Sequence, residues 1–221
     1  IVAAGEWACA AALTTFLVLL GLHGFLAYWK ERRWWGAVLA PVALLAALFT
    51  HSSAGFYLAA MMAFVGLSFV WRLWRRVDGA PSVRHHLITL AVLGLALAIY
   101  LPAYMSVGKY LLGNVAPWNP AWNIVGSLVF YIAPVLGCFA VAGIAFLASE
   151  GDDSAGLYLA SLIVPLLLLT FASNFTTASA AYYLPSLLIL SILAGVAGDR
   201  LLALAGSALA APVRLGLVAV V

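Results

Sequence analysis

The chain has 221 residues, of which 67% are hydrophobic and only 8% are charged, with a formal net charge of +3. A soluble domain carries about a quarter charged side chains, so this composition excludes an ordinary water-soluble protein. The mean hydropathy of +1.15 indicates a surface that is covered mostly by lipid. The pI near 9.0 reflects basic residues that anchor spans at a membrane surface, so we expect no nucleic-acid partner.

Apolar runs recur along the chain, and a helix of about 18 or more apolar residues can cross roughly 30 Å of hydrocarbon. The runs are continuous rather than alternating, which favours helices over a barrel. We predict an all-α polytopic transmembrane bundle of about seven or eight spans, forming a single domain over residues 1–221. The predicted spans are residues 8–28, 34–50, 54–71, 87–105, 122–148, 157–172 and 182–197, with a possible eighth at 201–221.

Basic residues predict the orientation of these spans. Lys109 falls on one side, and the other side carries Lys30, Arg32, Arg33, Arg72, Arg75, Arg76, Arg84 and Arg200. The basic side is expected to be cytoplasmic, which puts the N-terminus outside and predicts a multi-pass protein of a bacterial inner membrane. His85 and His86 adjoin Arg84 and are expected to belong to the basic boundary. An outside start without Met or a signal peptide predicts that the chain is the C-terminal part of a longer protein.

Four hydrogen-bonding side chains interrupt the apolar sequence on the outer side, at Thr50, His51, Ser52 and Ser53. One interpretation is structural: Ser52 or Ser53 caps the following helix by accepting from the N–H groups near residues 55–56. The other is functional: the turn meets the phosphate of a lipid-linked substrate, with His51 and the helix N–H groups as donors. The two interpretations are compatible, because a capped turn can also bind a ligand.

Several segments occur together in an order that resembles a known family. They are "GEW" at residues 5–7, "YWKERRWW" at 28–35, "LFTHSSAG" at 48–55 and "AAYYLPSLLILSILAG" at 180–195. In order, spacing and predicted sidedness the chain resembles the membrane region of GT-C glycosyltransferases, especially relatives of protein mannosyltransferases and aminoarabinose transferases. The resemblance implies transfer of a sugar from a polyprenyl-phosphate-linked donor to an acceptor on the outer face.

The resemblance also implies a set of site residues. Glu6 is the only acidic residue predicted on the outer side, and it is the candidate catalytic carboxylate or ligand of a divalent metal ion such as Mg²⁺ or Mn²⁺. The family's main base lies in an outer loop that is not in this sequence. The other candidates are His51 as a catalytic residue and Ser52, Ser53, Lys109, Tyr182 and Tyr183 as substrate-binding residues.

The chain departs from the family pattern at two positions. Ala8 and Ala181 stand where related sequences carry Arg, so the arginine that would hold the phosphate is absent. Lys109 could replace it, or could be an ordinary interfacial lysine. These departures keep a second hypothesis open, in which the chain is a non-catalytic integral membrane subunit packed against membrane protein partners. Cys9 and Cys138 lie in separate predicted spans and are expected to be small buried residues.

Overall fold

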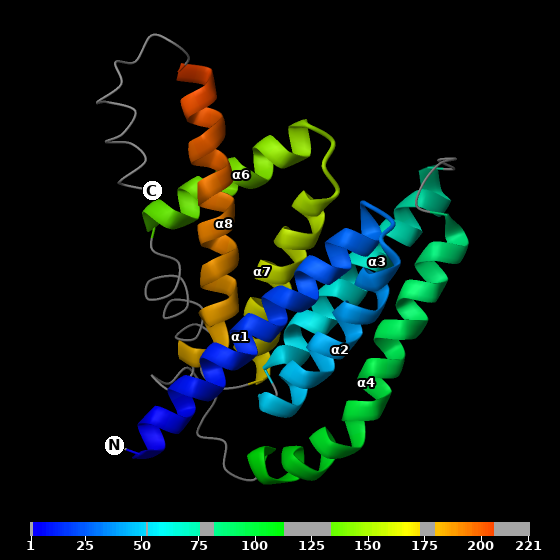
Figure 1. Cartoon of the computed structure of the whole chain (residues 1–221), viewed down its shortest axis with the longest axis vertical. Coiled ribbons are helices and arrows are strands. Elements are labelled where there is room, and N and C mark those ends of the chain that lie inside the picture. Colours follow the sequence, from blue (N-terminus) through cyan, green and yellow to red (C-terminus); the bar gives the residue numbers. More distant parts are fainter. Residues whose placement is uncertain (1, 52, 76–81, 113–133, 173–179, 206–221) are drawn as a thin grey trace.

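All secondary structure in the described residues is α-helical, which confirms the predicted class (Figure 1). The structure, a computed structural model, describes residues 2–51, 53–75, 82–112, 134–172 and 180–205. The helices in chain order are α1 (Val2–Trp29), α2 (Trp34–Thr50), α3 (Ala54–Arg75), α4 (Val83–Leu112), α6 (Pro134–Ser149), α7 (Ser154–Ala172) and α8 (Ala180–Ala205).

Four of these helices contain segments long and apolar enough to cross a membrane: Cys9–Trp29, Ala54–Trp74, Val83–Pro102 and Leu184–Leu204. Large apolar side chains point outward, with Phe16 61%, Leu67 69% and Val141 68% exposed. Such a surface is unfavourable in water and suited to hydrocarbon. The chain is therefore an integral membrane protein in contact with the lipid bilayer, and α2 and most of α6 and α7 are shorter apolar helices within it.

The buried core draws on helices from both halves of the chain. Its largest fully buried apolar side chains are Val18 and Phe25 from α1, Leu44 and Leu48 from α2, Tyr57, Leu58 and Met61 from α3, Leu93 from α4, Leu157 from α7, and Ile189 and Leu193 from α8. The core thus ties the first helical hairpin to α7 and α8, which lie more than a hundred residues later in the chain.

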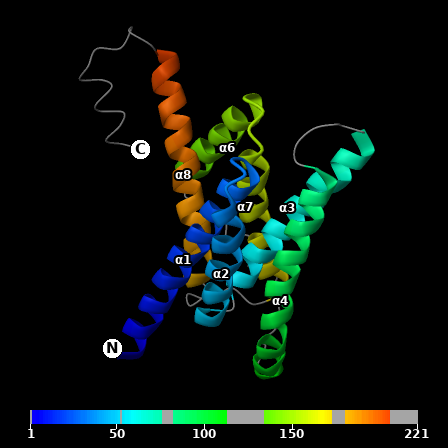
Figure 2. The ribbon, with the colours of Figure 1, turned by 45° about the vertical axis from the view of Figure 1, so that its right-hand side comes forward.

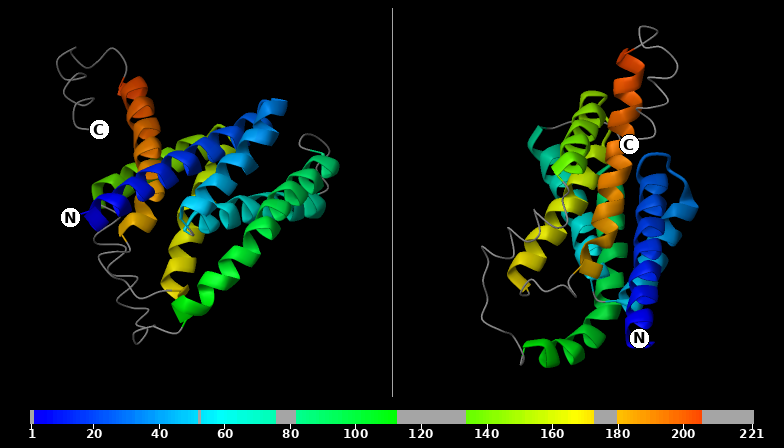
Figure 3. Two further views of the ribbon diagram at one scale, coloured as in Figure 1. Left: turned by 60° about the horizontal axis from the view of Figure 1, so that its bottom comes forward. Right: turned by 90° about the vertical axis from the view of Figure 1, so that its left-hand side faces the viewer.

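Glycines allow two helix pairs to approach closely. A methyl group at Gly36 of α2 would overlap the carbonyl oxygen of Gly24 in α1. A methyl group at Gly143 of α6 would overlap the carbonyl oxygen of Leu193 in α8, where α6 crosses α8 obliquely (Figures 1 and 3). Small residues let backbones meet in this way in membrane bundles, where dispersion forces rather than the hydrophobic effect hold helices together.

Several predicted helix boundaries are wrong. The predicted loop at residues 198–200 is absent, because α8 continues without a break to Ala205. Arg200 is accommodated on this helix by an ion pair with Glu150, at 2.8 Å. The predicted basic loop is also shorter, because α3 runs to Arg75 and α4 begins at Val83. The predicted span at 122–148 lies outside the described residues up to residue 133, and the possible span at 201–221 lies outside them from residue 206 onward.

One expectation about burial is also wrong, and two histidines at the predicted basic boundary are buried. Cys9 and Cys138 are exposed thiols, on surfaces that the bundle offers to lipid. His85 and His86 are buried, at 9% and 0% exposure, although they adjoin a predicted basic loop. His86 lies between the Ser68 hydroxyl, at 3.2 Å, and the Ser82 carbonyl, at 3.0 Å. These partners make burial of the imidazole possible, because a buried polar group needs hydrogen bonds.

The helix ends fall into two groups along the bundle. In Figures 1 and 2 the start of α1, the end of α2 and the end of α4 lie toward the lower end, as does the start of α8. We name this the α2–α3 end. The α1–α2 turn and the α6–α7 turn lie side by side at the opposite end, where Lys30 pairs with Asp152 at 2.7 Å. This second end carries the predicted cytoplasmic charges, although which end faces the cytoplasm stays a prediction.

Candidate functional site

The turn between α2 and α3 is built around His51. Its backbone continues from α2 by donating its N–H to the Ala47 carbonyl at 2.8 Å, and then becomes extended, with φ −157° and ψ 132°. The imidazole folds back over the turn, so that the Ser53 backbone N–H donates to Nδ1 at 3.2 Å. The Ser53 hydroxyl lies 2.9 Å from the same nitrogen and is buried, with the residue 4% exposed.

These contacts fix the protonation state of His51. A backbone N–H can only donate, so Nδ1 carries no proton and the neutral ring holds its proton on Nε2. Burial lowers the pKa of His51 below its ordinary value of 6.5, which also favours the neutral ring. At neutral pH the ring therefore carries its proton on Nε2, while Nδ1 is engaged in the turn. In this arrangement His51 can polarise a ligand oxygen but is not set up as a general base.

At the start of α3 the Ser53 hydroxyl does not act as the predicted cap, and the Ser52 alternative stays a prediction. The Phe56 N–H, a predicted partner of a serine hydroxyl, donates instead to the Ser53 carbonyl at 3.1 Å. The Ala54 N–H donates to the His51 carbonyl, also at 3.1 Å. The imidazole thus acts as the cap, because its Nδ1 accepts the hydrogen bond from the Ser53 N–H. The Ser53 hydroxyl faces His51 rather than the helix. Ser52 lies outside the described residues.

A buried hydrogen bond ties this turn to the segment that carries the last predicted motif. The Tyr57 phenol, in the first turns of α3, lies 2.8 Å from the Ser186 hydroxyl in the first turns of α8. Tyr57 is fully buried and Ser186 is 8% exposed. The sequence analysis missed both residues. The available signal was weak: Ser186 is a polar residue that directly follows the predicted Tyr-Tyr-x-Pro motif.

The remaining predicted site residues are placed only through their helices. Glu6 lies in α1, Lys109 in α4, and Tyr182 and Tyr183 in α8, but their side chains are outside the part of the chain that the structure describes. The helix ends that bear them lie toward the α2–α3 end, with the His51 turn (Figures 1 and 2).

The predicted divalent metal site likewise stays a prediction. Within the described residues no group of three or more His, Cys, Asp or Glu side chains could hold a metal ion. Glu6, the one carboxylate predicted to bind metal, is outside that search. The described part of the site thus combines a neutral imidazole that carries its proton on Nε2 with the N-terminus of α3, whose dipole favours an anion.

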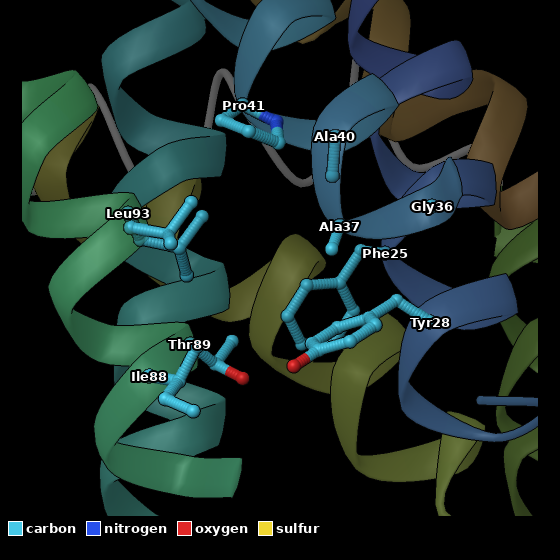
Figure 4. A pocket seen from close by; sticks show the side chains of 10 residues that line it. Phe25, Tyr28, Gly36, Ala37, Ala40, Pro41, Ile88, Thr89 and Leu93 are labelled. Atoms are coloured by element: carbon cyan, nitrogen blue, oxygen red, sulfur yellow. The ribbon is translucent and has the colours of Figure 1, made fainter. Parts of the chain in front are cut away.

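A small cavity lies away from this site, between α1, α2 and α4 (Figure 4). It measures about 30 Å³ and is lined mainly by apolar groups, with the side chains of Phe25 and Tyr28 from α1 facing Thr89 and Leu93 from α4. That volume is comparable to one water molecule. The cavity is a packing feature rather than a substrate pocket.

Comparisons with known protein families, with curated proteins and with solved structures find no match for this chain. The resemblance to GT-C glycosyltransferases therefore stays a prediction from the sequence. The structure establishes an α-helical integral membrane protein with a built histidine turn at one end of its bundle.

Proposed function

We propose that this chain is the membrane part of a glycosyltransferase that moves a sugar from a polyprenyl-phosphate-linked donor to an acceptor on the outer face. The observation that carries the proposal is the neutral His51, held in a defined orientation at the α2–α3 end. The helix ends bearing Glu6, Lys109, Tyr182 and Tyr183 lie toward the same end.

The chemistry of such a transfer suits this arrangement. Negative charge develops on the departing phosphate, and preorganised donors that meet it lower the barrier. The Nε2–H of His51 would be a donor of that kind, and the dipole of α3 favours an anion near the helix N-terminus. Glu6 would act on the acceptor as a base, or would hold a divalent metal ion whose charge stabilises the phosphate.

The test uses the complete encoded protein in lipid nanodiscs with a sugar-linked polyprenyl phosphate. Release of polyprenyl phosphate is measured for the wild type and for His51→Asn. Asparagine can place an oxygen near the position of Nδ1, so it keeps the acceptor for the Ser53 N–H while it removes Nε2. We expect release to fall by about a hundredfold or more, the typical cost of one such donor.

His23→Asn is the matched control, because His23 is an exposed histidine of α1. It is expected to keep wild-type release. Equal release from wild type and His51→Asn would contradict a role for the imidazole. An absence of any release or donor binding by the wild type would contradict the transferase proposal as a whole.

One observation favours a second candidate, a non-catalytic membrane subunit. His51 and Ser53 satisfy each other across a turn of three residues, and a cap of this kind needs no ligand to explain it. In a subunit the exposed apolar faces of α1, α3 and α6 would pack against partner helices. Purification of the native complex distinguishes the two: a subunit comes with stoichiometric membrane partners and does not bind the sugar donor.

A further inference from the structure

A polar cavity of about 430 Å³ lies at the end of the bundle opposite the His51 turn. Its walls are the α1–α2 turn, with Trp29, Lys30 and Arg32, and the α6–α7 turn, with residues 150–153. The two turns lie side by side in Figures 1 and 2. A volume of this size falls in the range of about 300–1,000 Å³ that is typical of small-molecule sites. None of the site residues discussed above lines it.

The charges of this cavity can be sorted by their partners. Lys30 pairs with Asp152 at 2.7 Å, and Glu150 pairs with Arg200 at 2.8 Å. Arg32 and Asp153 also line the cavity, and neither forms an ion pair with any described residue. One wall therefore offers a guanidinium and the facing wall offers a carboxylate.

The wall that carries Arg32 is held in an unusual conformation. Arg32 has a positive φ of 58°, a region that glycine adopts readily and arginine rarely does. Beside it, Trp29 is 3% exposed and is stacked on Phe25 with ring centroids 5.6 Å apart.

We infer that this cavity binds a zwitterionic phosphate ester that carries a primary ammonium group. Arg32 holds the phosphate, and Asp153 receives the ammonium. Guanidinium matches phosphate geometry, and an ammonium donates three hydrogen bonds to nearby oxygens. The ethanolamine headgroup of a phospholipid and free phosphoethanolamine share this chemistry. The cavity lies beyond the apolar segment Cys9–Trp29, at the depth of lipid headgroups, where indoles gather in membrane proteins.

The experiment measures ligand retention by the full chain, using native mass spectrometry and thermal shift in nanodiscs. The lipid arms contain phosphatidylethanolamine, phosphatidylcholine or phosphatidylglycerol, and a fourth arm adds free O-phosphoethanolamine in phosphatidylcholine. The variants are Arg32→Gly, Asp153→Asn and the control Arg33→Gln. Arg32→Gly removes the cation and suits the positive φ, so it does not disturb the turn. Arg33 pairs with Glu31 at 2.6 Å and does not line the cavity.

We expect the wild type to retain phosphatidylethanolamine at least about tenfold better than the other two lipids, and each cavity variant to lose that preference. Arg33→Gln should keep it. If free O-phosphoethanolamine binds and the lipid does not, the site takes the soluble form of the same ligand. Equal retention of all three lipids by the wild type, or an unchanged preference in Arg32→Gly and Asp153→Asn, would overturn the inference. No arm contains a sugar donor, so the result is independent of the proposed transferase function.

Discussion

The Tyr57 phenol and the Ser186 hydroxyl form a 2.8 Å hydrogen bond between α3 and α8, across 129 positions of sequence. The bond joins the helix that begins at the His51 turn to the helix that begins with the Tyr-Tyr-x-Pro motif. Both groups are buried in an apolar environment, where an unpaired hydroxyl is costly. The bond therefore fixes the relative position of the two segments that the resemblance assigns to one site.

A double-mutant cycle measures the strength of this bond. Tyr57→Phe and Ser186→Ala are each expected to lower the free energy of unfolding by about 1 kcal/mol, because hydrogen bonds within membrane bundles typically contribute that much or less. The double variant should cost less than the sum of the two single variants. The measurement is thermal or denaturant unfolding in detergent micelles. Strict additivity would show that the two hydroxyls do not act as a pair.

The His51 turn predicts a pH dependence of stability. Because burial holds the pKa of His51 below 6.5, the unfolded chain binds a proton at a higher pH than the folded chain does. The free energy of unfolding should therefore be highest above pH 6.5 and fall as the pH drops through the window between 6.5 and the folded pKa. His51→Asn should lack this component. We would compare unfolding curves of both proteins from pH 7.5 down to pH 5, and parallel curves would contradict the prediction.

The contribution of the His51 cap to stability can be measured separately from the effect of protonating His51. His51→Ala removes the acceptor for the Ser53 N–H and should cost about 1 kcal/mol, the typical loss for a helix cap. His51→Asn retains an acceptor and should cost only a small part of that. Unfolding at pH 7.5 compares them directly. If the two variants lose equal stability, the Ser53 N–H contact does not contribute as a cap.

The close helix pairs predict opposite effects for glycine substitutions at different sites. Gly36→Ala and Gly143→Ala place a methyl group against backbone atoms that cannot move aside, so each should cost about 1–3 kcal/mol. Gly66→Ala and Gly94→Ala are matched controls in α3 and α4, where no atom lies within 4 Å of the added methyl. They should be neutral or stabilising by up to about 1 kcal/mol. Equal effects in both groups would contradict the described packing of α1 on α2 and of α6 on α8.

The Lys30–Asp152 pair predicts an acid-sensitive contact between the two turns. Partial burial raises the pKa of the Asp152 carboxyl, but hydrogen bonds from Lys30 and Ser154 outweigh it and hold the pKa below its ordinary value of 3.8. The stabilisation is therefore present above pH 3.8 and is lost as the pH falls through the folded pKa. Lys30 is 41% exposed, so Lys30→Met should cost less than about 1 kcal/mol at neutral pH.

Asp152 also caps α7, so substitutions that keep or remove this cap should differ in their cost to stability. Its Oδ1 accepts from the Ser154 N–H at the start of α7, at 2.8 Å. Asp152→Asn keeps an acceptor for that cap, whereas Asp152→Ala removes both the cap and the ion pair. Asp152→Ala should therefore be the more destabilising by about 1 kcal/mol in the same unfolding assay. Equal losses for the two variants would show that the ion pair, and not the cap, carries the contribution of Asp152.

Features set by local sequence could be predicted, and features set by packing could not. Continuous apolar runs predicted the helical class, and the polar break at Thr50 to Ser53 predicted the turn, because both signals lie in neighbouring residues. The continuation of α8 past Ala197 was not predictable from its charges, since Arg200 reaches a partner 50 positions away. The burial of His86 likewise depends on Ser68, which lies on another helix.

In the candidate site, too, features set by local sequence could be predicted and features set by packing could not. The sequence located His51 and Ser53 in one turn, but the choice of the imidazole as capping acceptor depends on backbone angles that residue types alone do not specify. The contact of Tyr57 with Ser186 arises only when α3 and α8 pack. Nothing in the sequence of either segment indicates the other as its partner.

The central claim, a lipid-phosphate site at the α2–α3 end, is tested most directly by photo-crosslinking. A polyprenyl phosphate bearing a photoreactive group near its phosphate would be added to the complete protein in nanodiscs, and crosslinked peptides identified by mass spectrometry. The account predicts crosslinks to residues 50–54, to the start of α1 and to the start of α8, reduced in His51→Asn. Crosslinks confined to the opposite end, at residues 29–33 and 149–154, or spread evenly along the lipid-facing helices, would contradict it.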